Sequence, residues 1–227
     1  MRVADITLPI FPLGTVLFPG APLPLHIFEM RYRTMIHDVL ERADGLREFG
    51  VVAIRAGVEV GTHGVQSLHE VGCIAEIQQI EAFTDGSYDI LTRGTRRFRI
   101  VRVHPPVEER AAVAEVEVLG EESSSRSRDL AETATRLFRR YRRTILLTRG
   151  FDPDSPFTIP DDPVRCAFTI AAVIALDLTD RQRLLDAPSV DERLQLLADL
   201  LRRELAQIDR LSTRAGEELA HGRYSPN

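Results

Sequence analysis

The sequence contains no lysine, so every one of its 29 basic residues is arginine. A phosphate-binding loop that ends in Gly-Lys-Ser/Thr is therefore excluded, as are a Ser–Lys hydrolytic dyad and a Schiff-base lysine. Arginine cannot replace lysine as a base, because its guanidinium group keeps its proton at working pH. A Gly-x-Ser-x-Gly motif for a nucleophilic serine is missing as well. The sequence therefore gives no support for an enzyme.

Cysteine is scarce, with only Cys73 and Cys166 among 227 residues. Both lie inside apolar runs, far apart, and this pattern predicts two buried, reduced thiols rather than a disulfide framework. His69 precedes Cys73 by four residues, a spacing that two metal ligands on a helix could use. The pattern of the segment is that of a strand, however, and no second pair of ligands is nearby. We expect no metal site and no cofactor.

Long apolar stretches are also missing. The longest, near residues 167–176, is too short to span a bilayer, and Asp5, Pro9 and Pro12 interrupt the N-terminal segment where a signal peptide needs an apolar core. The formal net charge is −5, and neither half of the chain forms a basic tail. We expect a cytoplasmic protein that has no membrane partner and does not favour nucleic acid.

Residues 1–120 have the pattern of a β-rich lobe. Apolar runs over residues 8–13 and 23–28 are interrupted by prolines, which suits edge strands, and residues 29–43 have helical spacing. Further strands are expected over residues 49–54, 71–83, 88–92, 98–103 and 113–119. The run Ile74, Ile77, Ile80, Phe83 could also suit a helix, but the following Asp85-Gly86 is a hairpin turn signal and favours a bent or bulged strand. Together these strands predict a small, mostly antiparallel, barrel-like sheet.

The second half of the chain has helical periodicity. Residues 121–127 form a polar break and the best candidate linker, residues 128–215 predict a helical bundle lobe, and residues 216–227 predict a flexible tail. The segments 179–182 and 189–192 both match the capping box that begins a helix. The predicted fold is therefore α+β, with a β-rich N-lobe followed by an α-helical C-lobe.

Two groups of side chains are candidates for a binding site. Apolar residues are frequent among the prolines and glycines of the first 28 residues, and any that stay exposed would bind flexible chains. The candidate polypeptide contacts are Phe11, Phe18, Leu23 and Phe28. The second group is the arginine-rich segment 93–102, with Arg93, Arg96, Arg97 and Arg99 as candidate nucleic-acid contacts. Strand alternation places Arg97 and Arg99 on the face opposite Phe98, which is more typical of a solvated face than of a base-stacking surface.

A series of short motifs gives the sequence a family resemblance. They are Leu8-Pro-Ile-Phe-Pro-Leu13, Leu17-Phe-Pro-Gly20, Pro24-Leu-His-Ile-Phe-Glu29, the segments 71–77, 85–91 and 94–100, and Ser189-Val-Asp-Glu-Arg-Leu194. In this order, over residues 6–208, they resemble the bacterial Lon protease amino-terminal (substrate-binding) domain family. The resemblance implies a PUA-like pseudo-β-barrel followed by an α-helical bundle. It also implies recognition of unfolded or tagged polypeptides.

The expected function is therefore non-enzymatic recognition of unfolded or exposed apolar segments, as an adaptor or holdase-like domain. We expect a stand-alone protein without the ATPase and protease modules of that family, and a protease or chaperone is a further candidate partner. One alternative is an RNA-binding, PUA-like protein that uses residues 93–102. Another is a partner-binding scaffold that uses the apolar seam of the last helix, extended past Leu211 to Ala215 and Leu219.

Overall fold

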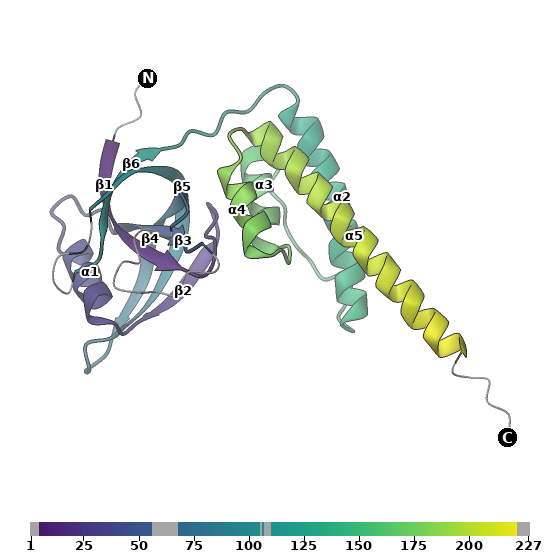
Figure 1. Cartoon of the computed structure of the whole chain (residues 1–227), viewed down its shortest axis with the longest axis horizontal. Coiled ribbons are helices and arrows are strands. Elements are labelled where there is room, and N and C mark those ends of the chain that lie inside the picture. The colour runs from purple at the N-terminus through teal and green to yellow at the C-terminus, as the bar shows by residue number, and fades with distance from the viewer. Residues whose placement is uncertain (1–4, 56–67, 105, 107–109, 222–227) are drawn as a thin grey trace. The chain divides into compact units, whose positions relative to one another are not determined.

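The computed structural model describes residues 5–55, 68–104, 106 and 110–221, with side chains described from residue 6 to residue 210. The chain divides into two compact units (Figure 1). The first, which we call the β unit, comprises residues 1–122 and 171–188, and the second, the helical unit, comprises residues 123–170 and 189–227. The predicted division placed residues 171–188 in the helical lobe; by their contacts they belong to the β unit.

Six strands form the sheet of the β unit, and their observed bounds are β1 Asp5–Leu13, β2 Pro22–Ile27, β3 Glu48–Ala53, β4 Val71–Ala82, β5 Tyr88–His104 and β6 Val113–Val118. The strand order is β2-β5-β4-β3-β1-β6, and an additional β5–β6 pairing closes five of the strands into the barrel seen in Figure 1. All pairs are antiparallel except β1–β3. The two strands predicted over 88–92 and 98–103 are one long strand, β5.

Strands β1 and β2 both contain prolines, and the sheet accommodates them in two different ways. β2 pairs only with the first half of β5, so it is the edge strand that its prolines predicted. β1 was also expected at an edge but lies inside the sheet. It pairs with β6 over residues 5–9 and with β3 over residues 10–13, so each half has one side without a ladder partner. Pro9 and Pro12 are tolerated there because a missing N–H costs no ladder hydrogen bond on an open side.

Two apolar cores stabilise the β unit. One fills the barrel around Ile10, Ile74 and Phe98. The other lies between the sheet and helix α1 (Met30–Leu40), whose buried residues are Tyr32, Met35, Ile36 and Val39. The run from Ile74 lies in a strand, as its turn signal favoured, but β4 ends at Ala82, before Phe83; the strand carries two irregularities in its register with β5. Cys73 is a free, fully buried thiol, and Cys166 is likewise free and buried, so the prediction for both cysteines is confirmed.

Among the described glycines of the β unit, Gly94 lies closest to the backbone of another segment. A Cβ added there would lie 2.3 Å from the Phe18 carbonyl oxygen, and backbone atoms cannot move aside as a flexible side chain can. The Gly94 N–H also donates to the Ala21 carbonyl, and its own carbonyl accepts from Gly20. We expect Gly94→Ala to lower the free energy of unfolding by about 2–4 kcal/mol, within the range of severe packing substitutions. Denaturant unfolding measures this change; Gly120→Ala is the control, because a Cβ at that glycine meets no atom within 4 Å.

Helix α4 (Leu178–Asp186) packs on the barrel, which explains why its segment belongs to the β unit. The Gln182 amide donates to the Val71 carbonyl at 3.0 Å, and Arg181 donates to the Val16 carbonyl at 3.2 Å. The helix begins after Asp177, whose carboxylate accepts from the Asp180 N–H at 2.8 Å. The capping box predicted at 179–182 is therefore wrong by two residues, because an Asx cap precedes it.

Three helices make the helical unit: α2 (Ser127–Thr148), the first part of α3 (Pro163–Val173) and α5 (Val190–His221). The start of α2 meets the start of α5, where Ser124 and Ser127 donate to Asp191. The predicted cap at 189–192 is present, since the Glu192 N–H donates to Ser189. Of the predicted flexible tail, residues 216–221 belong to helix α5, which ends at His221. The scaffold alternative depends on side chains after residue 210, which lie outside the described ones.

Candidate polypeptide-binding site

Exposed aromatic side chains gather at one end of the β unit. Phe28 is 66% exposed and Phe83 is 40% exposed, and the ring centroids of both lie near that of His26, at 6.0 and 6.4 Å. Met30, two residues after Phe28, is also exposed. Large apolar side chains are normally buried, so a group of exposed ones at one place indicates a binding surface. We call His26, Phe28, Met30 and Phe83 the aromatic platform.

The local sequence explains why these side chains face solvent. Ile27 ends β2 and is 1% exposed, so strand alternation turns His26 and Phe28 to the opposite side. Phe83 follows β4 and begins the hairpin to β5, where its N–H donates to the Ser87 carbonyl. Gly86 completes this turn with a φ of 82°. The hairpin therefore holds Phe83 at the end of the sheet rather than inside it.

Asp85 fixes the hairpin and adds charge beside the platform. Its carboxylate accepts from the Ser87 N–H at 2.9 Å and from the Ser87 hydroxyl at 2.7 Å. These hydrogen bonds hold the pKa of the Asp85 carboxyl below its usual value, so the group stays ionised at neutral pH. The hairpin thus presents a negative charge next to Phe83.

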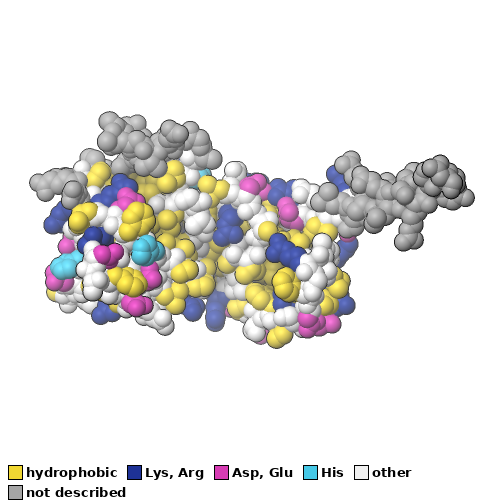
Figure 2. All heavy atoms as spheres, turned by 90° about the horizontal axis from the view of Figure 1, so that it is seen from below, with side chains coloured by type: hydrophobic (Ala, Val, Ile, Leu, Met, Phe, Trp, Pro, Cys, Tyr) yellow, Lys and Arg dark blue, Asp and Glu magenta, His cyan; other side chains and the backbone are white. Residues whose placement is uncertain are grey.

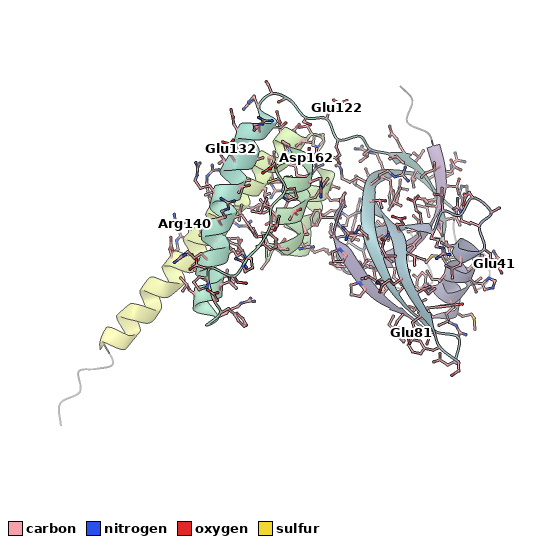
Figure 3. All side chains as sticks on the ribbon, turned by 180° about the vertical axis from the view of Figure 1, so that it is seen from behind. Glu41, Glu81, Glu122, Glu132, Arg140 and Asp162 are labelled. Atoms are coloured by element: carbon pink, nitrogen blue, oxygen red, sulfur yellow. The ribbon has the colours of Figure 1, made fainter. Side chains whose placement is uncertain are left out.

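A hollow of about 530 Å³ adjoins the platform on β2, β5 and β4. It is lined by Pro24, Leu25, His26, Gln79, Ile80, Glu81, Asp89, Ile90 and Leu91. The register places His26, Asp89 and Glu81 in one row across the three strands. His26 Nδ1 lies 2.6 Å from Asp89 Oδ1, and Figure 3 shows Glu81 near the hairpin end of β4. The hollow is therefore apolar at its floor and acidic at its rim.

This surface offers apolar and charged side chains that could contact a ligand. No group of three or more potential metal ligands occurs among the described residues. Burial raises the pKa of the Cys73 and Cys166 thiols, which keeps them protonated and unreactive. The exposed edge of β2 is also a poor template for an added strand, because Pro22 and Pro24 cannot donate backbone hydrogen bonds. An extended ligand would therefore be held by its side chains.

The four predicted polypeptide contacts differ in their burial. Phe11 is 7% exposed and Phe18 is fully buried, so the prediction that they contact a bound chain is wrong. Phe11 lies against Tyr32 in the core under α1, and the Arg181 guanidinium lies over the Phe18 ring. Leu23 is partly buried against the same core. Of the four, Phe28 alone remains on the open surface.

Sequence reasoning missed the other platform residues. Phe83 was placed in a strand, and the signal that could have found it is its position two residues before Asp85-Gly86, where a hairpin tip leaves side chains uncovered. Figure 2 shows the resulting surface, where apolar side chains of the β unit stand open among acidic and histidine side chains.

The candidate nucleic-acid arginines do not form one basic face. Arg97 is 2% exposed, because the C-terminal end of α4 and Glu121 cover its side chain. Arg96 binds both carboxylate oxygens of Glu48, at 3.0 and 3.2 Å, and Arg93 reaches the Gly20 carbonyl. Arg99 is exposed, but its partner across the β5–β6 ladder is Glu117. The expectation that Arg97 faces outward is therefore wrong, and acids interrupt the remaining arginines.

Arg97 instead connects three parts of the β unit. Its Nη1 donates to the carbonyls of Leu185 at 2.6 Å and Ala187 at 2.9 Å, at the C-terminal end of α4. Its Nε donates to the carboxylate of Glu121, just after β6. A cation suits this position, since the last carbonyls of a helix lack intrahelical partners and carry partial negative charge. Arg97 is a structural residue.

Comparison with known proteins relates this chain to the N-terminal part of Lon proteases. The family model of the ATP-dependent protease La (LON) substrate-binding domain matches residues 7–203. A Lon protease of Xanthomonas oryzae is 30% identical over 207 residues, covering 88% of this chain and 23% of the relative. Lon protease of Escherichia coli K12 is 27% identical, with coverages of 90% and 26%. The chain thus spans about a quarter of the length of these relatives.

Solved structures agree with this relationship. A Lon N-terminal domain protein from Xanthomonas campestris superposes with a TM-score of 0.60 and 27% identity, covering 85% of this chain and 96% of that one. The N-terminal domain of the Mycobacterium avium complex Lon protease has a TM-score of 0.61 at 22% identity, covering 87% and 98%, and supports the fold alone. None of the described helices is both long and apolar enough to cross a membrane. The chain belongs to the LON substrate-binding domain family.

Proposed function

We propose that this domain recognises unfolded polypeptides by binding their exposed apolar side chains on the aromatic platform, without catalysing a reaction. The observation that carries the proposal is the placement of Phe28, Met30 and Phe83 in solvent beside a hollow of about 530 Å³. It acts as an adaptor or holdase-like domain in the cytoplasm, and a protease or chaperone is the kind of protein that would receive its clients. Family membership supports the recognition of substrates.

Affinity is expected to be modest. Full burial of one large apolar side chain contributes about 1.5–3 kcal/mol, and the ordering of an unfolded chain opposes binding. Capture of two or three such side chains therefore corresponds to dissociation constants on the order of micromolar to millimolar. Glu81 and Asp89 at the hollow, together with Asp85 in the adjoining hairpin, add a preference for segments that carry a basic residue near the apolar ones.

Titration against a labelled, permanently unfolded polypeptide tests the proposal, with a labelled single-stranded RNA measured beside it at low and high salt. We expect polypeptide binding that persists at high salt, because apolar burial is not screened. RNA binding that falls steeply with salt, without polypeptide binding, would contradict the proposal, because phosphate contacts release counterions.

A further inference from the structure

Helix α2 carries a stripe of arginines on its exposed side. Between residues 133 and 151 the sequence has six arginines and no acid. Helical spacing brings four of them to the side opposite the buried residues Ala134, Phe138 and Tyr141. These four are Arg136, Arg139, Arg140 and Arg143, and we call them the arginine stripe. Figure 3 labels Arg140 on α2.

The charges of the stripe are only partly compensated. Arg143 pairs with Asp154 at 2.7 Å and Arg140 with Asp209 at 3.3 Å. The four side chains of these pairs are 58–75% exposed, and exposed pairs of this kind contribute little and exchange readily. Arg136 and Arg139 have no ion-pair partner among the described residues. Arg136 and Arg139 can therefore bind carboxylates from another chain, and Arg140 and Arg143 can exchange their exposed partners for such carboxylates.

Apolar side chains stand at the C-terminal end of the stripe. Leu147, one turn after Arg143, is 56% exposed, and Phe151 is 62% exposed. The chain turns there through Gly150, with a φ of 72°, and the Phe151 N–H donates to the Leu146 carbonyl at 2.8 Å. The turn therefore holds Phe151 close to the last turn of α2.

A third ring extends this apolar end. Phe157 is 40% exposed and packs against Phe138, with 5.5 Å between ring centroids, while the Arg142 guanidinium lies over its face at 5.5 Å. Contacts on two sides fix the ring although part of it faces solvent. The apolar end is therefore anchored to the helix rather than carried on a free loop.

We propose that the arginine stripe, together with Leu147, Phe151 and Phe157, docks an acidic segment of a partner protein. The segment would have Asp or Glu at helical spacing and an apolar residue at one end. From Arg136 to Leu147 the surface extends eleven residues of helix, about 16 Å, which suits a docked helix of three turns. Charge complementarity selects this partner, because the stripe is basic whereas the rim of the aromatic platform is acidic.

A polypeptide is favoured over a nucleic acid on two observations. Three large apolar side chains adjoin the arginines, and no base-stacking row of aromatic side chains alternates with them. The formal net charge of −5 also opposes the approach of a polyanion as long as RNA or DNA. A short acidic segment with an apolar end matches both features of the surface.

The test measures binding of a labelled 18-residue helical peptide with Glu at every third or fourth position and Leu and Phe at one end. A second peptide has Lys in place of each Glu. We expect the acidic peptide to bind more weakly as salt rises, and the lysine peptide to bind at least tenfold more weakly. The double variant Arg136→Glu/Arg139→Glu should lose at least tenfold in affinity. Arg165→Glu makes the same kind of charge change at an exposed arginine on α3 and should change affinity less than twofold.

Leu147→Ser tests the apolar end without changing the arginines. It should lower the affinity for the acidic peptide about threefold to tenfold at any salt concentration. Both sets of positions are exposed, so the circular dichroism spectrum and melting temperature are expected to match those of the unaltered protein. Equal binding of the two peptides, or unchanged binding by the double variant and by Leu147→Ser, would overturn the proposal. So would binding of single-stranded RNA through the stripe without binding of the acidic peptide.

Discussion

Replacing Phe28 and Phe83 with serine should weaken binding of an unfolded polypeptide at least tenfold and leave the stability of the fold almost unchanged. Each ring is exposed in the free domain and would be covered only by a bound chain. If each contributes half of the 1.5–3 kcal/mol available from full burial, the pair contributes about 1.5–3 kcal/mol, and tenfold in affinity is about 1.4 kcal/mol. Titration with the labelled polypeptide measures the change.

Val101→Ser is the matched control for this prediction. Val101 is 62% exposed and lies on the second half of β5, away from the residues that line the hollow. Its substitution removes a similar apolar surface and should leave the affinity unchanged within twofold. Equal losses for Val101→Ser and for the double variant would show that binding depends on general hydrophobicity, and the platform assignment would be wrong.

Replacing Arg97 with methionine should cause the largest loss of stability in the β unit. Methionine has a similar length but removes the hydrogen bonds that Arg97 donates to the Leu185 and Ala187 carbonyls and to the Glu121 carboxylate. Removing one partner of a buried ion pair costs about 3–5 kcal/mol. We expect the denaturant midpoint of unfolding to fall accordingly, and amide exchange in α4 to rise most.

Arg99→Met tests whether the effect belongs to Arg97 in particular. Arg99 lies two residues along β5 and is exposed, so its substitution should change the free energy of unfolding by less than about 0.5 kcal/mol. Glu121→Gln keeps a hydrogen-bond acceptor for Arg97 and should have an intermediate effect. A change below about 1 kcal/mol for Arg97→Met would contradict its role as the residue that holds α4 to the barrel.

Local patterns predicted most of the elements, because they are set by residues close in sequence. Asp85-Gly86 identified the hairpin, since positive φ at Gly86 is a property of the turn alone. The pairing of β1 with β3 and β6 was not predictable in the same way. It depends on contacts between residues 40 or more positions apart, and these place a proline-containing strand inside a closed sheet.

The candidate site was harder to predict than the fold. Phe18 and Phe28 occur in similar proline-rich surroundings, yet one is fully buried and the other is 66% exposed. The difference comes from α4, whose Arg181 covers Phe18 from a position more than 160 residues later. Arg97 shows the same limit, because its burial depends on the end of α4 rather than on the alternation of β5.

Photocrosslinking from the platform tests the central claim most directly. A photoreactive phenylalanine analogue would replace Phe83 in one variant, Phe28 in a second and Val101 in a third, and each would be irradiated with the labelled unfolded polypeptide. We expect crosslinked product from positions 83 and 28, and little from position 101. Crosslinking from position 101 with none from positions 83 and 28 would contradict the claim, because the bound chain would then lie on another face of the β unit.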